Sequence, residues 1–544
     1  TVKSQKVKVF KAGTDGSAGE MKGVADAQFS IKLNADYTNA INQGYKLEEI
    51  WASADSNGNY KGIDINGNVV TVDKTRATEA QRVAPSYAVI TSNKDGYAIS
   101  NYLPFGRYIM KETNTPKDYI AGNDVVFNIE KDESEYEIEN AVKNININNA
   151  LFESPVKIIK KDVDSNKPVT LSSASYKIRA TQDVINRATG KVVYHKGDYV
   201  QVKVGNNKYN VFKTNSDNLT SIPEGNVYAS KNDEKGSVTT PFKLPAGYYE
   251  IVEVESPDGF LIDTRPVPFV VTNTVNLDKD ADGDVISIVT QSNKQPKANI
   301  QINKSFELRE DDVDTSLISK DENGNINNLD KVTFELTAAD TITDKTDGRV
   351  VYNKGDIVAT KSLTNGKTIK FNNLWIGSYI VKEISTIDGA VLDTTEYPVA
   401  FEAKDNTTEQ YYQTLDITNY TTEIDVSKVD STGTNEIAGA NLTITDENGN
   451  VVDTWVSTTE IHKIEGLKVG KTYTLTEDMS PLGYNIANSI EFTVQNNKEI
   501  QKVSMTDNTV KVNKVDNNGN LIQGATLQVV STKTKNIIDK WVTG

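Results

Sequence analysis

Five segments of this chain place a lysine on the apolar face of a strand, and this pattern constrains the fold more than any other feature. The segments are Val7-x-Val9-x-Lys11, Val156-x-Ile158-x-Lys160, Ile300-x-Ile302-x-Lys304, Ile424-x-Val426-x-Lys428 and Val510-x-Val512-x-Lys514. Because side chains alternate between the faces of a strand, each lysine points the same way as the two aliphatic residues before it. A buried charge is costly unless it is paired or neutralised, so each lysine needs a specific partner inside a core.

Two further polar positions recur on apolar faces, in the same order along the chain. Four strands carry a glutamate: Tyr108-x-Met110-x-Glu112, Tyr249-x-Ile251-x-Glu253, Tyr379-x-Val381-x-Glu383 and Tyr473-x-Leu475-x-Glu477. Four later strands end in Asn or Asp, and alternation selects Asn149, Asn293, Asn419 and Asp507. Asn148 and Asn508 remain adjacent alternatives. Lys514 is followed by no glutamate strand, so we expect it to lack these partners.

A lysine, a carboxylic acid and an amide or second acid in one apolar core can react with one another. Desolvation favours the neutral forms of the amine and of the acid. A neutral amine held against a side-chain carbonyl is a nucleophile beside its electrophile, and positioning alone is worth roughly 7–11 kcal/mol. The glutamate can shuttle the protons. We therefore predict one amide crosslink per unit, formed once by the unit itself, without turnover of a substrate.

The predicted roles follow chain order within each unit. The nucleophiles are Lys11, Lys160, Lys304 and Lys428, the acceptors are Asn149, Asn293, Asn419 and Asp507, and the assisting acids are Glu112, Glu253, Glu383 and Glu477.

Composition excludes several classes of protein. The 544-residue chain has a formal net charge of −16, which argues against nucleic acid as a partner. It has no cysteine and only two histidines, which removes disulfides and most Ser-His-Asp and Cys-His arrangements. No apolar run approaches about 18 residues, and no signal peptide opens the chain. We expect a fragment of a mature protein without its targeting or anchoring ends, with no membrane insertion and no cofactor.

One acidic stretch, 278–284, resembles the start of a calcium loop. The twelfth position from Asp278 is Val289, where a bidentate glutamate is required. We therefore interpret the stretch as an acidic turn and predict no metal site.

The lysine, glutamate and Asx positions divide the chain into repeats. We predict units at 1–150, 151–295, 296–420 and 421–508, followed by an incomplete fifth unit at 509–544. Regularly spaced short strands, joined by turns such as the one at 446–450, predict β-sandwiches. The first unit differs through a long insertion at about 34–85, in which we expect short helices around Leu47–Ala54 and Thr75–Val83.

These motifs carry a resemblance to a known family. The lysine strand, the box Tyr473-Thr-Leu-Thr-Glu477-Asp-Met-Ser-Pro481-Leu-Gly-Tyr484 and the late Val503-Ser-Met-Thr-Asp507 resemble the collagen-adhesin B-type (prealbumin-like, SpaA-type pilin) domains of Gram-positive surface adhesins and pilins. The third unit departs from the box, because Glu383 is followed by Ile387-Asp-Gly389-Ala390, which puts the packing around its glutamate in doubt.

The resemblance implies an all-β fold of tandem immunoglobulin-like (B-type) sandwiches in an elongated rod, with intramolecular isopeptide bonds between the first and last strands. It implies a stalk or shaft segment of an extracellular, cell-wall-anchored protein, with neighbouring domains or pilin subunits as partners. It also supports Asp507 as an acceptor. Two other classes remain open. One is an adhesin module that binds a host matrix protein or glycan through 34–85, and the other is an extracellular hydrolase, for which no catalytic set can be assembled.

Overall fold

The structure is a computed structural model that describes residues 5–14, 22–33, 47–54, 60–64, 69–72, 86–103, 106–131, 142–273, 278–308, 317–364 and 366–544. The chain forms two compact units. The first comprises Thr1–Pro296 with Asp344–Arg349 and Lys404–Glu409, and the second comprises Lys297–Thr343, Val350–Ala403 and Gln410–Gly544.

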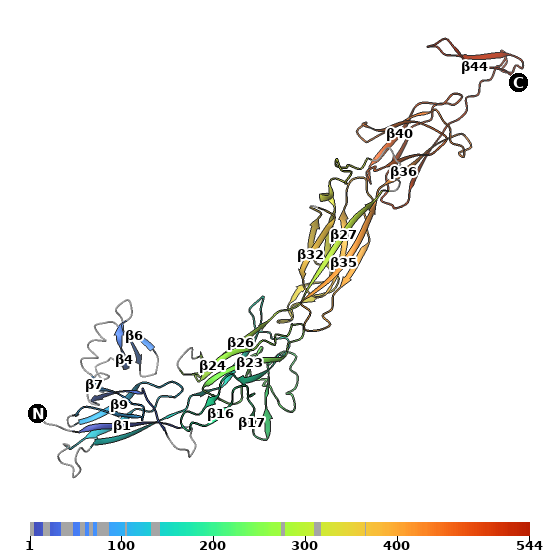
Figure 1. The fold of residues 1–544 in the computed structure, drawn as a ribbon. Coiled ribbons are helices and arrows are strands. Elements are labelled where there is room, and N and C mark those ends of the chain that lie inside the picture. Colours follow the sequence, from blue (N-terminus) through green and yellow to red (C-terminus); the bar gives the residue numbers. More distant parts are fainter. Residues whose placement is uncertain are drawn as a thin grey trace. The chain divides into compact units, whose positions relative to one another are not determined.

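The first unit begins with a region, β1 to β11, in which two four-stranded sheets face each other (Figure 1). One sheet contains β1 (Lys6–Thr14), β2 (Lys22–Gly23), β8 (Tyr97–Ile99) and β11 (Val142–Ala150). The other contains β3 (Gln28–Leu33), β7 (Ser86–Thr91), β9 (Gly106–Asn114) and β10 (Val125–Ile129).

The insertion of this first region carries a third sheet of its own. Its strands are β4 (Leu47–Ala54), β5 (Tyr60–Asp64) and β6 (Val69–Val72), in that order. The predicted helix at Leu47–Ala54 is therefore wrong: its Leu, Glu and Ala residues favour a helix, but pairing with β5 prevails over that weak local preference. The second predicted helix, Thr75–Val83, lies outside the described residues.

The second region, β12 to β26, repeats this architecture with additional hairpins. The lysine-bearing sheet contains β13 (Val156–Asp162), β21 (Ser237–Thr239), β25 (Asp278–Lys279) and β26 (Val285–Asn293). The opposing sheet contains β14 (Ser175–Ala180), β19 (Val211–Lys213), β20 (Val227–Tyr228), β23 (Gly247–Glu255) and β24 (Val267–Val271). The two-stranded pairs are β12 (Glu153–Ser154) with β22 (Leu244–Pro245), β15 (Val184–Ile185) with β16 (Val192–Tyr194), and β17 (Val202–Val204) with β18 (Asn207–Tyr209).

The second unit begins with the third region, β27 to β35. Its lysine-bearing sheet contains β27 (Lys297–Glu307), β32 (Thr368–Leu374) and β35 (Gln410–Tyr420). The opposing sheet contains β28 (Thr333–Ala338), β31 (Ile357–Ser362), β33 (Ser378–Ser385) and β34 (Glu396–Ala400). A short 3-10 turn, η3 (Leu329–Lys331), and the pair β29 (Ile342–Thr343) with β30 (Val350–Tyr352) complete it.

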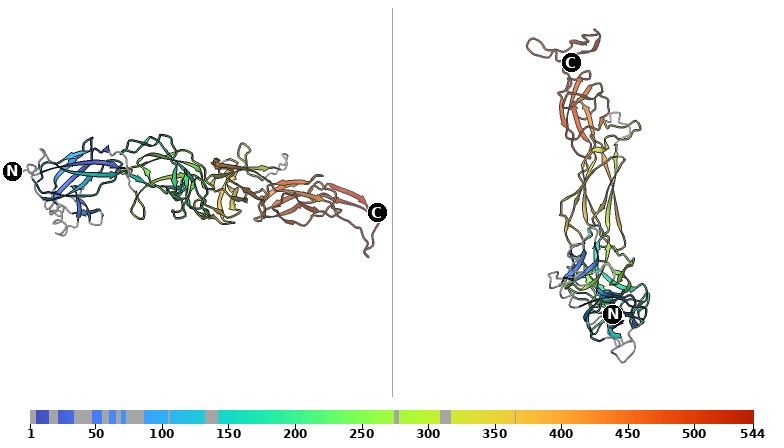
Figure 2. Two further views of the ribbon diagram at one scale, coloured as in Figure 1. Left: turned by 90° about the horizontal axis from the view of Figure 1, so that it is seen from below. Right: turned by 90° about the vertical axis from the view of Figure 1, so that its left-hand side faces the viewer.

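The fourth region, β36 to β42, is the smallest of the four. One sheet contains β36 (Glu423–Val429), β39 (His462–Glu465) and β42 (Gln501–Thr506). The other contains β37 (Asn441–Thr445), β38 (Val451–Val456), β40 (Thr472–Met479) and β41 (Ile490–Thr493). Figure 2 shows the strands of all four regions from two further directions.

All four regions share one topology. The lysine strand (β1, β13, β27 or β36) pairs in parallel with the last strand of its region (β11, β26, β35 or β42). The glutamate strand (β9, β23, β33 or β40) belongs to the opposing sheet. Each region has its own cluster of buried hydrophobic residues between the two sheets. The lysine and the late Asx are therefore neighbours in one sheet, and the glutamate approaches them from the other.

Residues 509–544 differ from the four regions. The predicted strand Val510–Lys514 does not form, which corrects that expectation, and β43 (Thr526–Val530) pairs only with β44 (Ile537–Val542) in a two-stranded sheet. With no second sheet among the described residues to cover the segment, its apolar side chains, such as Val512 and Ile537, stay exposed.

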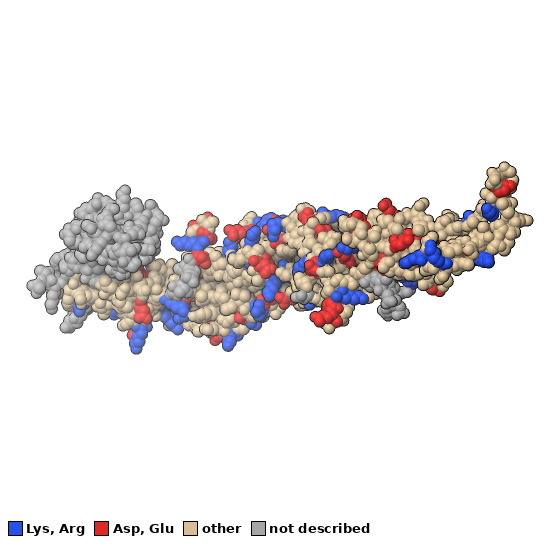
Figure 3. Space-filling view, turned by 90° about the horizontal axis from the view of Figure 1, so that it is seen from above, with Lys and Arg blue, Asp and Glu red and all other residues tan. Residues whose placement is uncertain are grey.

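The surface carries charges of both signs, which are interspersed over the described residues on the face shown in Figure 3. The acidic stretch 278–284 forms a turn between β25 and β26, in which Asp280 Oδ1 accepts from the backbone amides of Asp282 and Asp284 at 3.0 and 2.9 Å. This confirms its interpretation as a turn. Among the described residues, no helix has the length and hydropathy that crossing a membrane requires.

Candidate functional site

The parallel pairing of the lysine strand with the last strand has the same register in every region. Lys11 lies opposite Ile147, Lys160 opposite Gln291, Lys304 opposite Ile417 and Lys428 opposite Met505. In each case the predicted acceptor comes two residues later, on the last strand in the first three regions and one residue after the end of β42 in the fourth. It therefore lies on the same face as the residue opposite the lysine. The four sites are therefore built in the same way.

All members of these sites are removed from solvent. The lysine side chains are 0–2% exposed and the glutamate side chains 0–2% exposed. Asn149, Asn293, Asn419 and Asp507 are 0–3% exposed as residues. The adjacent alternatives, Asn148 and Asn508, are exposed, as is Lys514. The alternation of side chains along the last strands therefore predicted correctly which Asn or Asp side chain is buried in each core.

In the first two sites the glutamate bridges the lysine and the asparagine. Lys11 Nζ lies 2.9 Å from both carboxylate oxygens of Glu112, and Asn149 Nδ2 donates to Glu112 Oε1 at 3.0 Å. In the second site Lys160 Nζ donates to Glu253 Oε1 at 2.7 Å. The carbonyl oxygens of Asn149 and of its counterpart in the second site accept no hydrogen bond from the described residues.

In the third and fourth sites the lysine contacts the acceptor itself. Lys304 Nζ donates to Asn419 Oδ1 at 2.5 Å and lies 3.7 Å from Glu383 Oε1, while Asn419 Nδ2 donates to Glu383 Oε2 at 2.6 Å. In the fourth site, Lys428 Nζ contacts Asp507 Oδ1 and lies 3.0 Å from Glu477 Oε1. The amine and the side-chain carbonyl are thus in direct contact.

Burial moves several of these groups toward their neutral forms. Desolvation lowers the pKa of Lys11, and it lowers the pKa of Lys160 and of Lys304 to about 8, against the opposing attraction of the nearby glutamate. Desolvation also raises the pKa of Glu383 and that of Asp507. In the third site, where the pKa of Lys304 is lowered and that of Glu383 is raised, a neutral amine beside a neutral acid is more accessible than it would be in water.

A backbone amide supports every glutamate, and the sequence analysis missed it. The amide ten residues after the glutamate donates to its Oε2 atom at 2.6–3.0 Å; the four donors are Gly122, Asp263, Asp393 and Ala487. The donors share no residue type because the contact uses only the main chain. The donor always lies ten residues after the glutamate, and this spacing is the one regularity in the sequence that goes with the contact.

A β-bulge also follows every glutamate. On the glutamate strand, one extra residue without a partner on the neighbouring strand of the same sheet comes directly after Glu112, Glu253, Glu383 and Glu477. Bulges change the direction of side chains and often lie beside functional sites. Here the bulge lies at the start of the segment whose amide, ten residues after the glutamate, donates to the carboxylate.

The third site keeps its geometry although its loop lacks the proline and the aromatic residue. The amide of Ala390 donates to the Ile387 carbonyl at 3.3 Å, as Tyr119 does to Pro116 in the first site at 3.3 Å. Ile387 and Ala390 are buried. Small and aliphatic side chains therefore replace the proline and the aromatic ring, and the doubt about packing around Glu383 is resolved.

The residues present allow nucleophilic attack of an amine on a side-chain amide or acid, assisted by a carboxylic acid. Among the described residues, no three His, Cys, Asp or Glu side chains form a group that could hold a metal ion.

Comparison with protein families identifies the class of this chain. The model of the SpaA family, described as a prealbumin-like fold domain, matches residues 14–142, 154–283, 314–415 and 422–509. The chain therefore belongs to this family, and its prealbumin-like domain occurs four times. The match confirms the predicted family and, with the sheets described above, the all-β fold. No curated protein matches the sequence.

Several solved structures are similar to this chain at low sequence identity. The Bacillus anthracis TIE protein is 15% identical, with 92% of this chain and 74% of that chain covered and a TM-score of 0.36. The major pilin subunit BcpA of Bacillus cereus is 16% identical, with 66% and 100% covered and a TM-score of 0.28. The shaft pilin SpaA of Lactobacillus rhamnosus GG is 16% identical, with 54% and 98% covered and a TM-score of 0.19. At these TM-scores the likeness carries no conclusion about the function of this chain.

Proposed function

We propose that this chain is a structural stalk or shaft segment of a Gram-positive surface adhesin or pilin, in which each of four domains closes one isopeptide bond. The domains are 1–150, 151–295, 296–420 and 421–508, followed by the incomplete unit 509–544. The observation that carries the proposal is the buried set of lysine, glutamate and Asx, repeated four times at one register offset.

In the first three domains the proposed reaction joins lysine to asparagine. The glutamate takes a proton from the lysine ammonium, which leaves a neutral amine and a neutral acid. The lysine Nζ attacks the asparagine Cγ, the Nζ–Cγ bond forms, and the Cγ–Nδ2 bond breaks. The glutamate relays one of the two amine protons to the departing nitrogen, which leaves as ammonia, and the other proton stays on the new amide nitrogen. The direct contact of Lys304 Nζ with Asn419 Oδ1 supports this arrangement of nucleophile and electrophile.

In the fourth domain the acceptor is an acid, so water is lost instead. A carboxylate resists attack, whereas a protonated carboxylic acid accepts it. Burial raises the pKa of Asp507, which favours the protonated form. Glu477 lies beside the lysine of this pair and serves as the proton relay. The reaction occurs once per domain, so the chain is not an enzyme in the sense of turnover.

A bond between the first and last strands has a mechanical consequence. These strands are parallel neighbours in each region, and they lie at the two ends of the region's sequence. A pulling force that enters at one end would pass through the covalent bond and largely bypass the core. The crosslinks thus supply the stiffening that a chain without cysteine cannot obtain from disulfides. This role fits an extracellular, cell-wall-anchored protein whose partners are neighbouring subunits.

The mass of the intact chain tests this proposal. Three losses of ammonia and one of water would make the chain about 69 Da lighter than its sequence mass. A mass equal to that of the unmodified sequence would refute the crosslinks. As a control, Asn419→Ala should return about 17 Da and leave the other three losses in place.

A second candidate is an adhesin module that binds a host matrix protein or glycan through the insertion at 34–85. The observation that favours it is that β4, β5 and β6 form a sheet that shares no strand with the two sheets of the first region. Binding of matrix proteins or glycans by the whole chain should then vanish when 34–85 is deleted, while the four mass losses persist. Binding that survives the deletion would exclude the insertion as the binding element.

A further inference from the structure

The loop after each glutamate strand holds the backbone amide that hydrogen-bonds the glutamate. Any contact that fixes this loop also fixes the carboxylate. In the first and third regions, a side-chain amide from the region that follows in the sequence makes such a contact. Both amides belong to an asparagine just after the penultimate long strand of the following region, Asn273 after β24 and Asn496 after β41.

In the first unit, Asn273 binds three main-chain groups of the loop that follows Glu112. Its Oδ1 atom accepts from the Asp118 amide at 2.8 Å. Its Nδ2 atom donates to the carbonyl of Pro116 at 3.3 Å and to the carbonyl of Tyr119. The loop then continues to Gly122, whose amide donates to Glu112.

In the second unit, Asn496 binds both main-chain groups of one residue, Leu392. Its Oδ1 atom accepts from the Leu392 amide at 2.8 Å, and its Nδ2 atom donates to the Leu392 carbonyl at 3.2 Å. The next residue is Asp393, whose amide donates to Glu383 Oε2 at 3.0 Å. The Leu392 carbonyl and the Asp393 amide belong to one peptide group, so the asparagine and the glutamate bind opposite ends of the same peptide unit.

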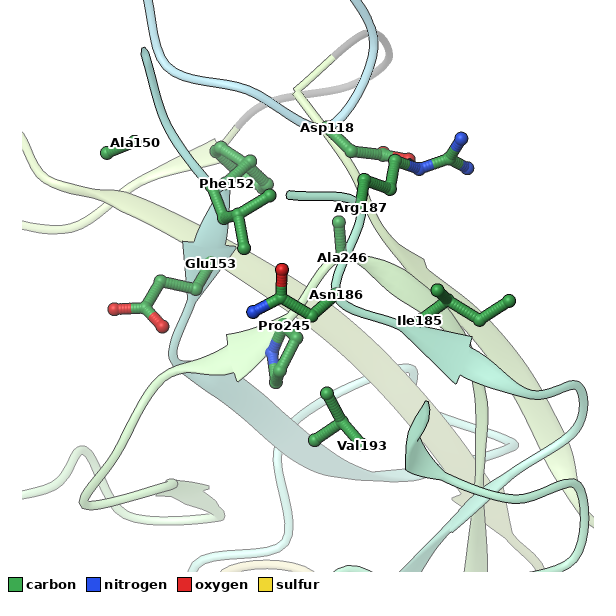
Figure 4. Close-up of a pocket in the computed structure, with 11 residues that line it drawn as sticks. Asp118, Ala150, Phe152, Glu153, Ile185, Asn186, Arg187, Val193, Pro245 and Ala246 are labelled. Carbon is green, nitrogen blue, oxygen red and sulfur yellow. The ribbon is translucent and has the colours of Figure 1, made fainter. Parts of the chain in front are cut away.

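An ion pair and a cavity lie beside the loop that Asn273 contacts. Arg187 Nε lies 2.9 Å from Asp118 Oδ2, and a cavity of about 250 Å³ lies beside this pair (Figure 4). The loop also makes main-chain bonds, from the Ile120 amide to the Ala150 carbonyl and from the Phe152 amide to the Asp118 carbonyl. The directional hydrogen bonds of Asn273 add a side-chain contact to these.

The fourth region offers an internal contrast. Its loop makes two main-chain bonds, from the Asn485 amide to the Asn508 carbonyl and from the Val510 amide to the Gly483 carbonyl. The loops of the first and third regions make the same two bonds at equivalent positions, so the contrast lies only in the asparagine side chain. Among the described residues, no asparagine of the following segment clamps this loop. The fourth site is thus completed without a following sandwich.

We propose that Asn273 and Asn496 are positioning residues for the crosslinking site of the preceding domain. This inference rests on the proposed function. Each asparagine fixes the loop whose amide orients the glutamate, and the glutamate must be oriented to relay protons. A domain would then crosslink fastest once the next domain has folded and docked, so that bond formation is coupled to correct assembly along the chain.

The test is Asn496→Ala in the full chain, with Asn497→Ala as the matched control. Asn497 is the next residue, and its Oδ1 atom accepts from the Glu499 amide at 3.0 Å, away from the loop of the third region. The chain is recovered unfolded and uncrosslinked, refolded by dilution, and sampled by peptide mass spectrometry over time. We expect the Lys304–Asn419 bond to form about tenfold more slowly in Asn496→Ala, and at the wild-type rate in Asn497→Ala.

Two internal readouts separate positioning from general damage. The Lys428–Asp507 bond belongs to the domain that carries Asn496, so an unchanged rate there shows that this domain still folds. Asn496→Asp keeps the acceptor for the Leu392 amide and should recover part of the rate. Equal slowing of both bonds, or an unchanged Lys304–Asn419 rate, would overturn the inference.

Hydrogen exchange distinguishes failure of this inference from failure of the proposed function. If the wild-type chain forms no Lys304–Asn419 bond, the proposed function fails, yet the clamp can still be measured. Asn496→Ala should speed exchange of the Asp393 amide about tenfold, because that amide loses its fixed position. Unchanged exchange at Asp393 would refute the positioning role whether or not the bond forms.

Discussion

Lys428 and Lys514 lie in nearly the same sequence and in opposite environments. Each follows two alternating valine or isoleucine residues and precedes Val-Asp. Lys428 is 2% exposed and contacts both Glu477 and Asp507. Lys514 lies in a segment that forms no strand, and it is exposed.

The difference teaches that the lysine motif does not bury itself. β36 is covered because β42 pairs with it in parallel and because the sheet of β40 packs opposite. Residues 510–514 have no such neighbours among the described residues. Burial of the amine is a property of the completed sandwich, and the proposed chemistry depends on that burial.

Glu477→Ala should make Lys428 as unreactive as Lys514. Without a proton relay the bond should not form, and the mass should rise by about 18 Da relative to the wild type, apart from the substitution itself. The lost bond spans 79 residues of sequence, so the free energy of unfolding of this domain should fall by about 4–5 kcal/mol on a chain-entropy estimate.

Differential scanning calorimetry measures this effect as a separate transition of the fourth domain. A melting temperature of that domain lowered by about 20 °C is expected from its size. A variant that keeps the mass loss would show that Glu477 is not required.

The pH dependence of the free energy of unfolding reports the desolvation of a buried lysine that has not formed a crosslink. In Asn419→Ala, Lys304 stays an amine, with a folded pKa lowered from 10.5 to about 8 by burial. Between these two values the unfolded chain binds more protons than the folded chain, so stability should rise with pH by up to a few kcal/mol. In the wild type the amide nitrogen does not titrate, and this rise should be absent.

Chemical denaturation at pH 7.5 to 10.5 tests this difference, with the wild type as reference. If the free energy of unfolding changed with pH in the same way in both chains, either Lys304 would not be desolvated or it would lack the crosslink in the wild type as well.

Gly122→Ala tests the loop at the first site. A Cβ atom there would lie 2.7 Å from Ile147 Cγ2 and 2.9 Å from Asn149 Oδ1, so the loop or the asparagine must move. We expect destabilisation of the first domain by about 1–3 kcal/mol and slower formation of the Lys11–Asn149 bond. Peptide mass spectrometry reads this bond against the other three in the same sample, and equal rates for all four would contradict the prediction.

Lys514→Ala should change the least. An exposed side chain outside any crosslink alters stability by no more than about 0.5 kcal/mol, and the mass losses should be unchanged. Loss of one crosslink in this variant would mean that Lys514 supplies a nucleophile after all.

Alternation of polar and apolar residues was sufficient to predict the core of each site. Asn149 rather than Asn148, and Asp507 rather than Asn508, point inward because strand side chains change face at every residue. The same rule predicted a strand at Val510–Lys514 and was wrong. An alternating segment forms a strand only where a neighbouring strand is present to pair with it. Alternation of polar and apolar residues also did not predict that Leu47–Ala54 would form a strand.

The supporting contacts could not be predicted from single positions. The amides of Gly122 and Asp393 act through the main chain, which carries no residue signature. Asn273 and Asn496 act from another domain, so their role depends on docking rather than on local sequence. Local patterns thus predict which lysine, glutamate and Asx side chains are buried together, and tertiary structure determines the contacts that hold them.

Peptide mapping of the native chain is the most direct test of whether buried lysines become bonded and the exposed one does not. Trypsin should fail to cut after Lys11, Lys160, Lys304 and Lys428, and fragmentation should find branched peptides that join them to Asn149, Asn293, Asn419 and Asp507. Cleavage should proceed normally after Lys514. Linear, unmodified peptides ending at the four buried lysines would contradict the crosslinks.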